Sequence, residues 1–228
     1  MSRYGCRSPR NTILTDGYHI LNKPRVRVIH NVANGPNVDV IVDGKVVLEN
    51  VAYKAISDYL KLSEGNHIFE IAPTGTNDVI TSLNANLEMN KEYTIIAHGL
   101  ITDINSISLL GLIDNNNCPV NGKAHVRFIH AAAGVPAVDI IANNTLEVFT
   151  DVKYGNTGQP TYLPIDAGNV DLSVVLAGTN NVALGPIPLT LENRKVYTIV
   201  ASGLPDNKNA PLSALVSVDT DCSTVNVN

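Results

Sequence analysis

The chain has few aromatic and few charged residues. It contains no tryptophan and three phenylalanines among 228 residues, and charged side chains account for 16%. The formal net charge is −5, so the surface is not basic enough to neutralise a row of phosphates, and a nucleic-acid partner is not expected. No uninterrupted apolar run approaches the length of a transmembrane helix, which predicts no membrane span.

The first residues also lack the features of a secretory signal. Residues 1–10 are polar and basic, and no long apolar stretch with a small-residue cleavage site follows them. We therefore expect the chain to be made in a cytosol without signal-dependent export. It can still reach an extracellular surface if the cell that made it lyses, and a cytoplasmic location is the alternative.

What the chain does have is an internal repeat. Arg25–His30 reads Arg-Val-Arg-Val-Ile-His, and the related sequence Val-Arg-Phe-Ile-His ends at His130. Tyr93-Thr94-Ile95 returns as Tyr197-Thr198-Ile199, and other matches continue at an offset of about 100 residues. A self-match of this length indicates two copies of one domain.

Each copy has the pattern of an all-β domain. Its apolar residues are mainly Val, Ile and Leu, which favour strands. Short alternating stretches such as Val38–Val42 are separated by turns, and Asp43-Gly44 is a strong hairpin signal. The sequence predicts seven or eight strands a copy, which indicates two tandem immunoglobulin-like β-sandwich domains.

The repeat boundaries divide the chain into five parts. We predict an extended N-terminal arm (1–23), a first sandwich (24–114), a linker (115–123), a second sandwich (124–218) and a C-terminal tail (219–228). The arm contains a short apolar alternation at Thr12–Thr15. It is interpreted either as a lead-in without fixed structure or as a segment that pairs with a sheet edge of its own or a neighbouring chain.

Two polar pairs recur at the same spacing in both copies. His30 precedes Asp39 as His130 precedes Asp139. A histidine and a carboxylate can form a catalytic pair or half of a metal site, but no nucleophile recurs beside them and no third ligand has suitable spacing. We interpret them as structural polar residues, and we expect no catalytic residue, metal or cofactor.

Tyrosines and arginines recur as well. Tyr93 and Tyr197 begin a late strand, where a tyrosine often fixes a sandwich corner through its hydroxyl. Arg27 and Arg127 either hold a carboxylate across the sheet or are solvated. Four further tyrosines are expected in the core or at a domain interface, with an exposed sugar-stacking surface as the alternative: Tyr53, Tyr59, Tyr154 and Tyr162.

The three cysteines lie outside the predicted sandwiches. Cys6 is in the arm, and Cys118 and Cys222 follow the last strand of each repeat. An odd number cannot pair completely within one chain. They are either inert reduced thiols or candidates for intersubunit disulfides formed under oxidising conditions.

The first repeat resembles the domain-of-unknown-function family 4397. The residues that carry the resemblance are Arg25–His30, Gly35–Val40, Val42–Lys45, Tyr53, Ser57–Leu60 and Glu64–Asn66. The second repeat is looser, since Asn143-Asn144-Thr145 replaces the Asp-Gly turn. The resemblance implies tandem β-sandwiches in surface or secreted proteins and transfers no catalytic residue. Such proteins usually carry a signal peptide, which this chain lacks.

Together these features predict a non-enzymatic structural subunit of an extracellular assembly. The settings considered are a spore coat or spore appendage fibre, and a virion surface. The expected partner is the chain itself, as a homo-oligomer, fibre or lattice. The alternative is a cell-surface adhesin or carbohydrate-binding module that binds a surface glycan or another surface protein.

Overall fold

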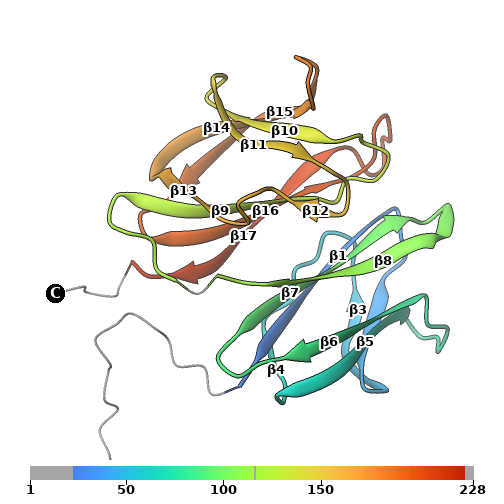
Figure 1. Cartoon of the computed structure of the whole chain (residues 1–228). Coiled ribbons are helices and arrows are strands. Elements are labelled where there is room, and N and C mark those ends of the chain that lie inside the picture. The colour runs from blue at the N-terminus through green and yellow to red at the C-terminus, as the bar shows by residue number, and fades with distance from the viewer. Residues whose placement is uncertain (1–22, 116, 224–228) are drawn as a thin grey trace, which may run out of the picture.

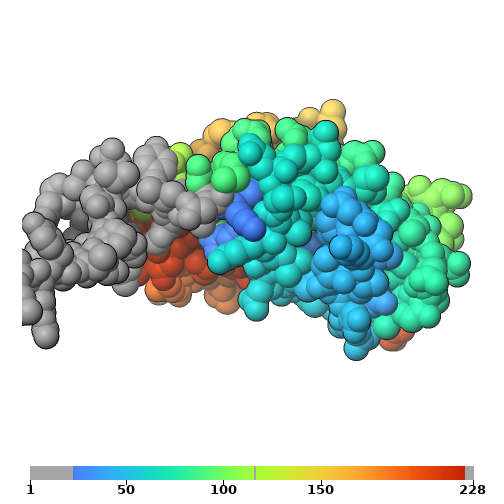
Figure 2. Space-filling view, turned by 90° about the horizontal axis from the view of Figure 1, so that it is seen from below, coloured from blue at the N-terminus to red at the C-terminus, as the bar shows by residue number. Residues whose placement is uncertain are grey.

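The computed structural model describes residues 23–115 and 117–223, which form 17 strands and no helix. The strands make four sheets, two in each repeat (Figure 1). The predicted all-β class and the β-sandwich architecture are confirmed. Seen from below, the first repeat lies in front of the second, whose orange and red atoms show at its margins (Figure 2).

The first repeat has eight strands in two four-stranded sheets. The sheet orders are β4-β1-β7-β8 and β3-β2-β5-β6. The strands are β1 (Arg25–Ala33), β2 (Val38–Val42), β3 (Lys45–Val51), β4 (Leu60–Lys61), β5 (Gly65–Pro73), β6 (Thr81–Leu87), β7 (Glu92–Leu100) and β8 (Asp103–Ile113).

The second repeat keeps this arrangement with nine strands. Its sheet orders are β12-β9-β16-β17, with β13 also beside β9, and β11-β10-β14-β15. The strands are β9 (Lys123–His130), β10 (Val138–Ala142), β11 (Leu146–Val152), β12 (Asn156–Thr157), β13 (Leu163–Asp166), β14 (Gly168–Leu176), β15 (Val182–Leu191), β16 (Lys195–Ser202) and β17 (Ser213–Asp221).

The strand order differs from that of an immunoglobulin constant domain. In both repeats the first strand runs parallel to the seventh or its counterpart, as β1 does with β7 and β9 with β16. An immunoglobulin constant domain instead has sheets of the first, second, fifth and fourth strands and of the third, sixth and seventh. Alternation and turn spacing specify strands and a sandwich, whereas the choice of neighbours depends on contacts between residues far apart in sequence.

The central strand β1 is buried on both faces. Val26, Val28 and Val32 face the core of the first sandwich. Ile29, on the opposite face, belongs to a separate apolar cluster with Ile96, Ile129, Ala131 and Val200. That cluster joins β1 and β7 to β9 and β16. The two sandwiches therefore pack sheet against sheet and are not connected by the linker alone.

Turn chemistry explains the hairpin between β2 and β3. Asp43 and Gly44 have positive φ angles of 51° and 76°, which suit a two-residue hairpin turn. Asn143 and Asn144 have φ angles of 49° and 62°, so the second repeat keeps the same turn. Asparagine tolerates this left-handed conformation.

Two boundaries differ from the predictions. The last strand, β17, continues to Asp221, three residues beyond the expected end at Val218, because Thr220 and Asp221 still pair with β16. Residues 57–62, for which the sequence also predicts a strand, contain only the two-residue β4. The predicted arm lies outside the described residues apart from Lys23.

Candidate functional site: a buried charge cluster between the repeats

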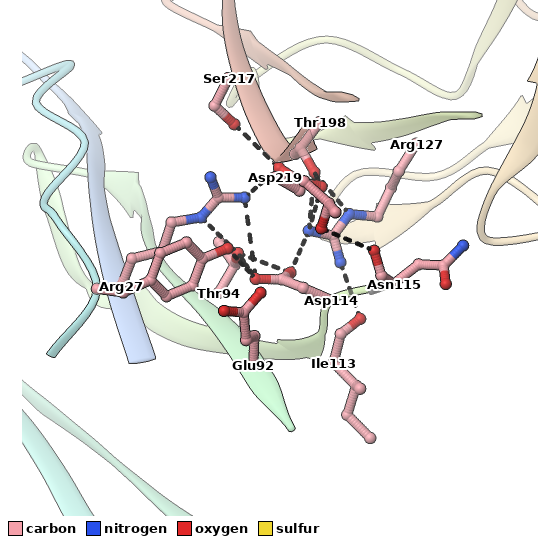
Figure 3. Close-up of polar contacts among 12 residues, drawn as sticks. Arg27, Glu92, Thr94, Ile113, Asp114, Asn115, Arg127, Thr198, Ser217 and Asp219 are labelled. Carbon is pink, nitrogen blue, oxygen red and sulfur yellow. Dashed lines mark hydrogen bonds and ion pairs between the residues drawn. The ribbon is translucent and has the colours of Figure 1, made fainter. Parts of the chain in front are cut away.

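Two arginines point from the matching strands β1 and β9 into the interface between the repeats (Figure 3). Arg27 is 2% exposed and Arg127 is 0% exposed. Arg27 Nη2 donates to Asp219 Oδ1 at 2.5 Å, and Arg127 Nη2 donates to Asp114 Oδ1 at 2.5 Å. Asp114 follows the last strand of the first repeat, and Asp219 lies in the last strand of the second. Each arginine therefore bonds the carboxylate of the other repeat.

A threonine connects each arginine to the carboxylate of its own repeat. Arg27 Nε donates to Thr94 Oγ1 at 2.8 Å, and the same hydroxyl lies 2.8 Å from each oxygen of Asp114, to which it donates. Thr198 makes the corresponding contacts in the second repeat, at 3.0 and 2.5 Å. The contacts are thus reciprocal, as in an interface between two identical subunits.

A tyrosine covers each end of the cluster. Tyr59 donates to Asp114 Oδ2 at 2.7 Å, and its ring centroid is 5.1 Å from the guanidinium carbon of Arg27. Tyr162 donates to Asp219 Oδ2 at 2.9 Å, with the other guanidinium carbon 4.8 Å from its ring. Burial, followed by the nearby carboxylates, raises the pKa of both tyrosines well above its usual value. Both hydroxyls are therefore donors.

We call this cluster the arginine clamp: Arg27, Thr94, Asp114 and Tyr59 from the first repeat, and Arg127, Thr198, Asp219 and Tyr162 from the second. Burial opposes the charge of Arg27, but Asp219 and Asp114 raise its pKa above the usual value. Two positive and two negative groups balance within the clamp. Removing one partner of such a buried pair typically costs about 3–5 kcal/mol, since it leaves an uncompensated charge.

The carboxylates of the clamp are fully engaged in hydrogen bonds to its other side chains. The carboxylate of Asp114 already accepts from Thr94, Tyr59 and Arg127. That of Asp219 likewise accepts hydrogen bonds from three side chains of the clamp. Oxygens engaged in this way hold the repeats in register, because any shift would leave buried polar groups unpaired.

Further polar contacts flank the clamp in matching places. Tyr53 Oη is 3.0 Å from Ser202 Oγ. Tyr154 Oη, at the corresponding place in the second repeat, is 2.9 Å from His98 Nδ1. Burial lowers the pKa of His98 below its usual value. The four tyrosines proposed for the core or for a domain interface therefore lie at the interface between the repeats.

A disulfide closes one side of this interface. Cys118 and Cys222 are bonded to each other across a sequence separation of 104 residues. The sequence predicts for these two residues either inert reduced thiols or intersubunit disulfides, and the structure instead joins them to each other within one chain. Their matching positions after the last strands bring them together because the repeats meet reciprocally. Cys6, the third candidate, lies outside the described residues.

The recurring histidines and aspartates bond backbone groups instead of each other. His30 Nε2 lies 2.9 Å from the carbonyl of Pro36, and Asp39 Oδ1 accepts the amide of Asn50 at 2.8 Å. His130 and Asp139 make the equivalent contacts with Pro136 O and Asp151 N, both at 2.8 Å. Burial lowers the pKa of both histidines, an effect partly opposed by the carbonyl contacts. Their roles in this structure are to hold neighbouring turns.

The two corner tyrosines form the same contact in each repeat. Tyr93 Oη accepts the amide of Glu88 at 2.9 Å, and Tyr197 Oη accepts that of Glu192 at 2.9 Å. Both side chains are buried, at 7% and 4% exposure. Each hydroxyl therefore fastens the turn before its strand.

A serine, a histidine and an aspartate also meet in the first repeat. His67 Nδ1 is 2.7 Å from Asp43 Oδ2, and its Nε2 is 3.2 Å from Ser63 Oγ. The Ser63 carbonyl is closer to Nε2, at 3.0 Å. Nδ1 faces a carboxylate and Nε2 faces a carbonyl as well as a hydroxyl, so the tautomer of His67 decides which of these contacts are hydrogen bonds. Asp43 also accepts the Ile68 amide, as Asn143 does for its counterpart, which favours a turn-holding role.

The described residues also bear on two other kinds of site. Residues 23–115 and 117–223 contain no group of three or more His, Cys, Asp or Glu side chains placed to hold a metal ion. The same residues contain no helix that could span a membrane.

Sequence reasoning identified only part of the clamp. It singled out Arg27 and Arg127 but left their partners open. Asp114 and Asp219 were missed, although both come at the end of their repeats, as the two structural cysteines do. The sequence feature that could have indicated the clamp is the recurrence of polar residues on the strand face that points away from the sandwich core.

These features define a class: a tandem β-sandwich protein whose two repeats are fastened back to back. The family described as domain of unknown function (DUF4397) matches residues 24–141 and 124–227. The chain therefore belongs to this family, with two tandem copies. No curated protein matches the sequence.

Proposed function

We propose that the protein is a non-enzymatic structural subunit of an extracellular assembly, such as a spore coat, a spore appendage fibre or a virion surface. The observation that supports this most is how the repeats are joined. The arginine clamp and the Cys118–Cys222 disulfide fasten two sandwiches into one body. A structural subunit needs such a body to transmit force and resist unfolding.

The disulfide also favours the extracellular setting. Disulfides persist in oxidising surroundings and are rare in the cytosol, where thiols are kept reduced. A chain released by lysis of the cell that made it would meet such surroundings. With Cys118 and Cys222 bonded to each other, contacts of the N-terminal arm join the subunits, and under oxidising conditions Cys6 adds a disulfide to the Cys6 of another copy.

The experiment is negative-stain microscopy together with non-reducing gel electrophoresis of the purified full-length chain. We expect fibres or lattices that depend on the arm, and crosslinked bands that disappear in a Cys6→Ser variant. A protein that stays monomeric under oxidising conditions at high concentration would contradict the proposal. It would favour the alternative, a surface adhesin or carbohydrate-binding module.

A further inference from the structure

An open groove lies at one end of the second repeat, between the start of β15 and the loop 203–212. Its volume is about 640 Å³, which is within the range of pockets that hold a drug-sized ligand. Its rim carries Asp206, Asn207 and Lys208. Its apolar lining comprises Val182, Ala183, Leu184, Leu204, Pro211 and Leu212.

The loop that forms one wall is held by its own hydrogen bonds. Leu204 N donates to Ala210 O at 2.9 Å, and Ala210 is fully buried. Asn207 Oδ1 accepts the amides of Asn209 and Ala210 at 2.9 and 3.0 Å. The groove is therefore preformed, which reduces the ordering cost of binding.

The first repeat has no comparable loop at this end. There the hairpin between β7 and β8 continues until Leu100 pairs with Asp103, and Ile107 is buried in the core. In the second repeat the matching segment contains Pro205 and Pro211. Proline has no amide hydrogen to donate to a neighbouring strand, so the segment that contains Pro205 and Pro211 does not continue the hairpin. Leu212, which corresponds to Ile107, is then only half-buried and lines the groove.

The other wall is the beginning of an edge strand. Among the described residues, β15 pairs with β14 alone, and Val182 at its start is 58% exposed. Pro186 and Pro188 protect the later part of this edge, because proline cannot donate to an added strand. The stretch Val182–Leu184 is left for an extended peptide to pair with, while apolar side chains of that peptide enter the groove.

We propose that this groove binds the N-terminal arm of a second copy of the chain, through the apolar pair Ile13-Leu14. The lining contains no aromatic side chain, so it suits an aliphatic peptide better than a stacked sugar. Residues 1–22 contain three arginines and one aspartate, whereas the whole chain has a net charge of −5. The arm is therefore positive and the remainder negative, which favours their association.

The position of the groove would make the contact propagate. β1, to which the arm is attached, begins at the lower left of Figure 1, whereas the groove is formed by β15 and the loop 203–212 at the top and upper right. An attachment point for the arm at one end and a groove at the other give head-to-tail contacts, which extend into fibres unless the ring closes. This inference rests on the proposed function and specifies its subunit contact.

The test uses three full-length variants. Val182→Asp places a charge in the groove, and Ile13→Asp places one in the arm. Val79→Asp is the matched control, because Val79 holds the corresponding place in the first repeat and is 46% exposed. We expect the groove and arm variants each to raise the concentration for half-assembly at least tenfold in sedimentation velocity, with Val79→Asp unchanged.

Mixing the two impaired variants gives the decisive measurement. The Ile13→Asp chain keeps its groove and the Val182→Asp chain keeps its arm, so we expect a 1:1 dimer that neither forms alone. If Ile13→Asp prevents assembly but Val182→Asp does not, this proposal is wrong and the proposed function stands. If the wild-type chain is a monomer at all concentrations, both are wrong.

Discussion

After β7 the first repeat continues its hairpin, whereas after β16 the second repeat leaves the ladder and forms the loop 203–212. On the sheet faces that meet, the two repeats instead keep the same arginine, threonine, tyrosine and aspartate in the same contacts. A reciprocal interface constrains both copies at once, because each residue is needed by the other repeat. The end of a repeat that faces away from this interface carries no such constraint, so its sequence can change and acquire a separate function.

The largest expected effect comes from breaking the clamp on one side. Arg127→Met leaves the carboxylate of Asp114 buried without its partner, at 0% side-chain exposure. We expect a loss of about 3–5 kcal/mol in the free energy of unfolding, measured by urea denaturation. Arg27→Met is the comparison and should cost less, because Arg127 alone also donates to the Ile113 carbonyl. Equal, small losses would show that the clamp contributes little.

The disulfide should come next. Reducing Cys118–Cys222 releases a crosslink across 104 residues, and removal of a native disulfide typically costs about 2–5 kcal/mol. We expect a lower unfolding midpoint under reducing conditions in a Cys6→Ser background, which excludes effects of Cys6. An unchanged midpoint would mean that the bond does not restrain the unfolded chain. The double variant Cys118→Ala, Cys222→Ala should show the same loss without reductant.

The corner tyrosines offer a comparison in which the repeats should behave alike. Tyr93→Phe and Tyr197→Phe each remove one hydrogen bond to a turn amide at 2.9 Å. The expected loss is about 1 kcal/mol for each, measured by thermal or urea denaturation. A clear difference between the two variants would show that the turns do not depend equally on this contact.

The smallest effect concerns the histidine that only the first repeat supplies to the interface. Burial lowers the pKa of His98 in the folded chain, so the unfolded chain binds more protons. The free energy of unfolding should therefore fall as the pH decreases below the usual pKa of about 6.5. His30 and His130 contribute in the same direction.

Replacing His98 by serine gives the first repeat the residue of the second, Ser202. We expect the decrease in stability between neutral and mildly acidic pH to become shallower in His98→Ser. The measurement is urea denaturation at several pH values. A pH dependence identical to that of the wild-type chain would exclude His98 as a contributor.

The internal repeat and the turn residues made much of the fold predictable. The strand Val38–Val42 was predicted with the bounds that the structure has, because alternation and flanking turns are local signals. The choice of strand neighbours is not a local property, and the observed strand order differs from that of an immunoglobulin constant domain. At the site, recurrence drew attention to Arg27 and Arg127, yet nothing near either residue in sequence identifies its partner.

A duplicated all-β protein can be inferred from the sequence alone, since the periodicity of each strand and the chemistry of each turn depend on neighbouring residues. That the outer faces of the two repeats meet is seen only in the folded chain. Burial of Arg27 and Arg127 is tolerable only where carboxylates from the other repeat reach them, and Cys118 can meet Cys222 only after that packing. These depend on distances between residues roughly 100 or more apart in the chain, which local patterns do not encode.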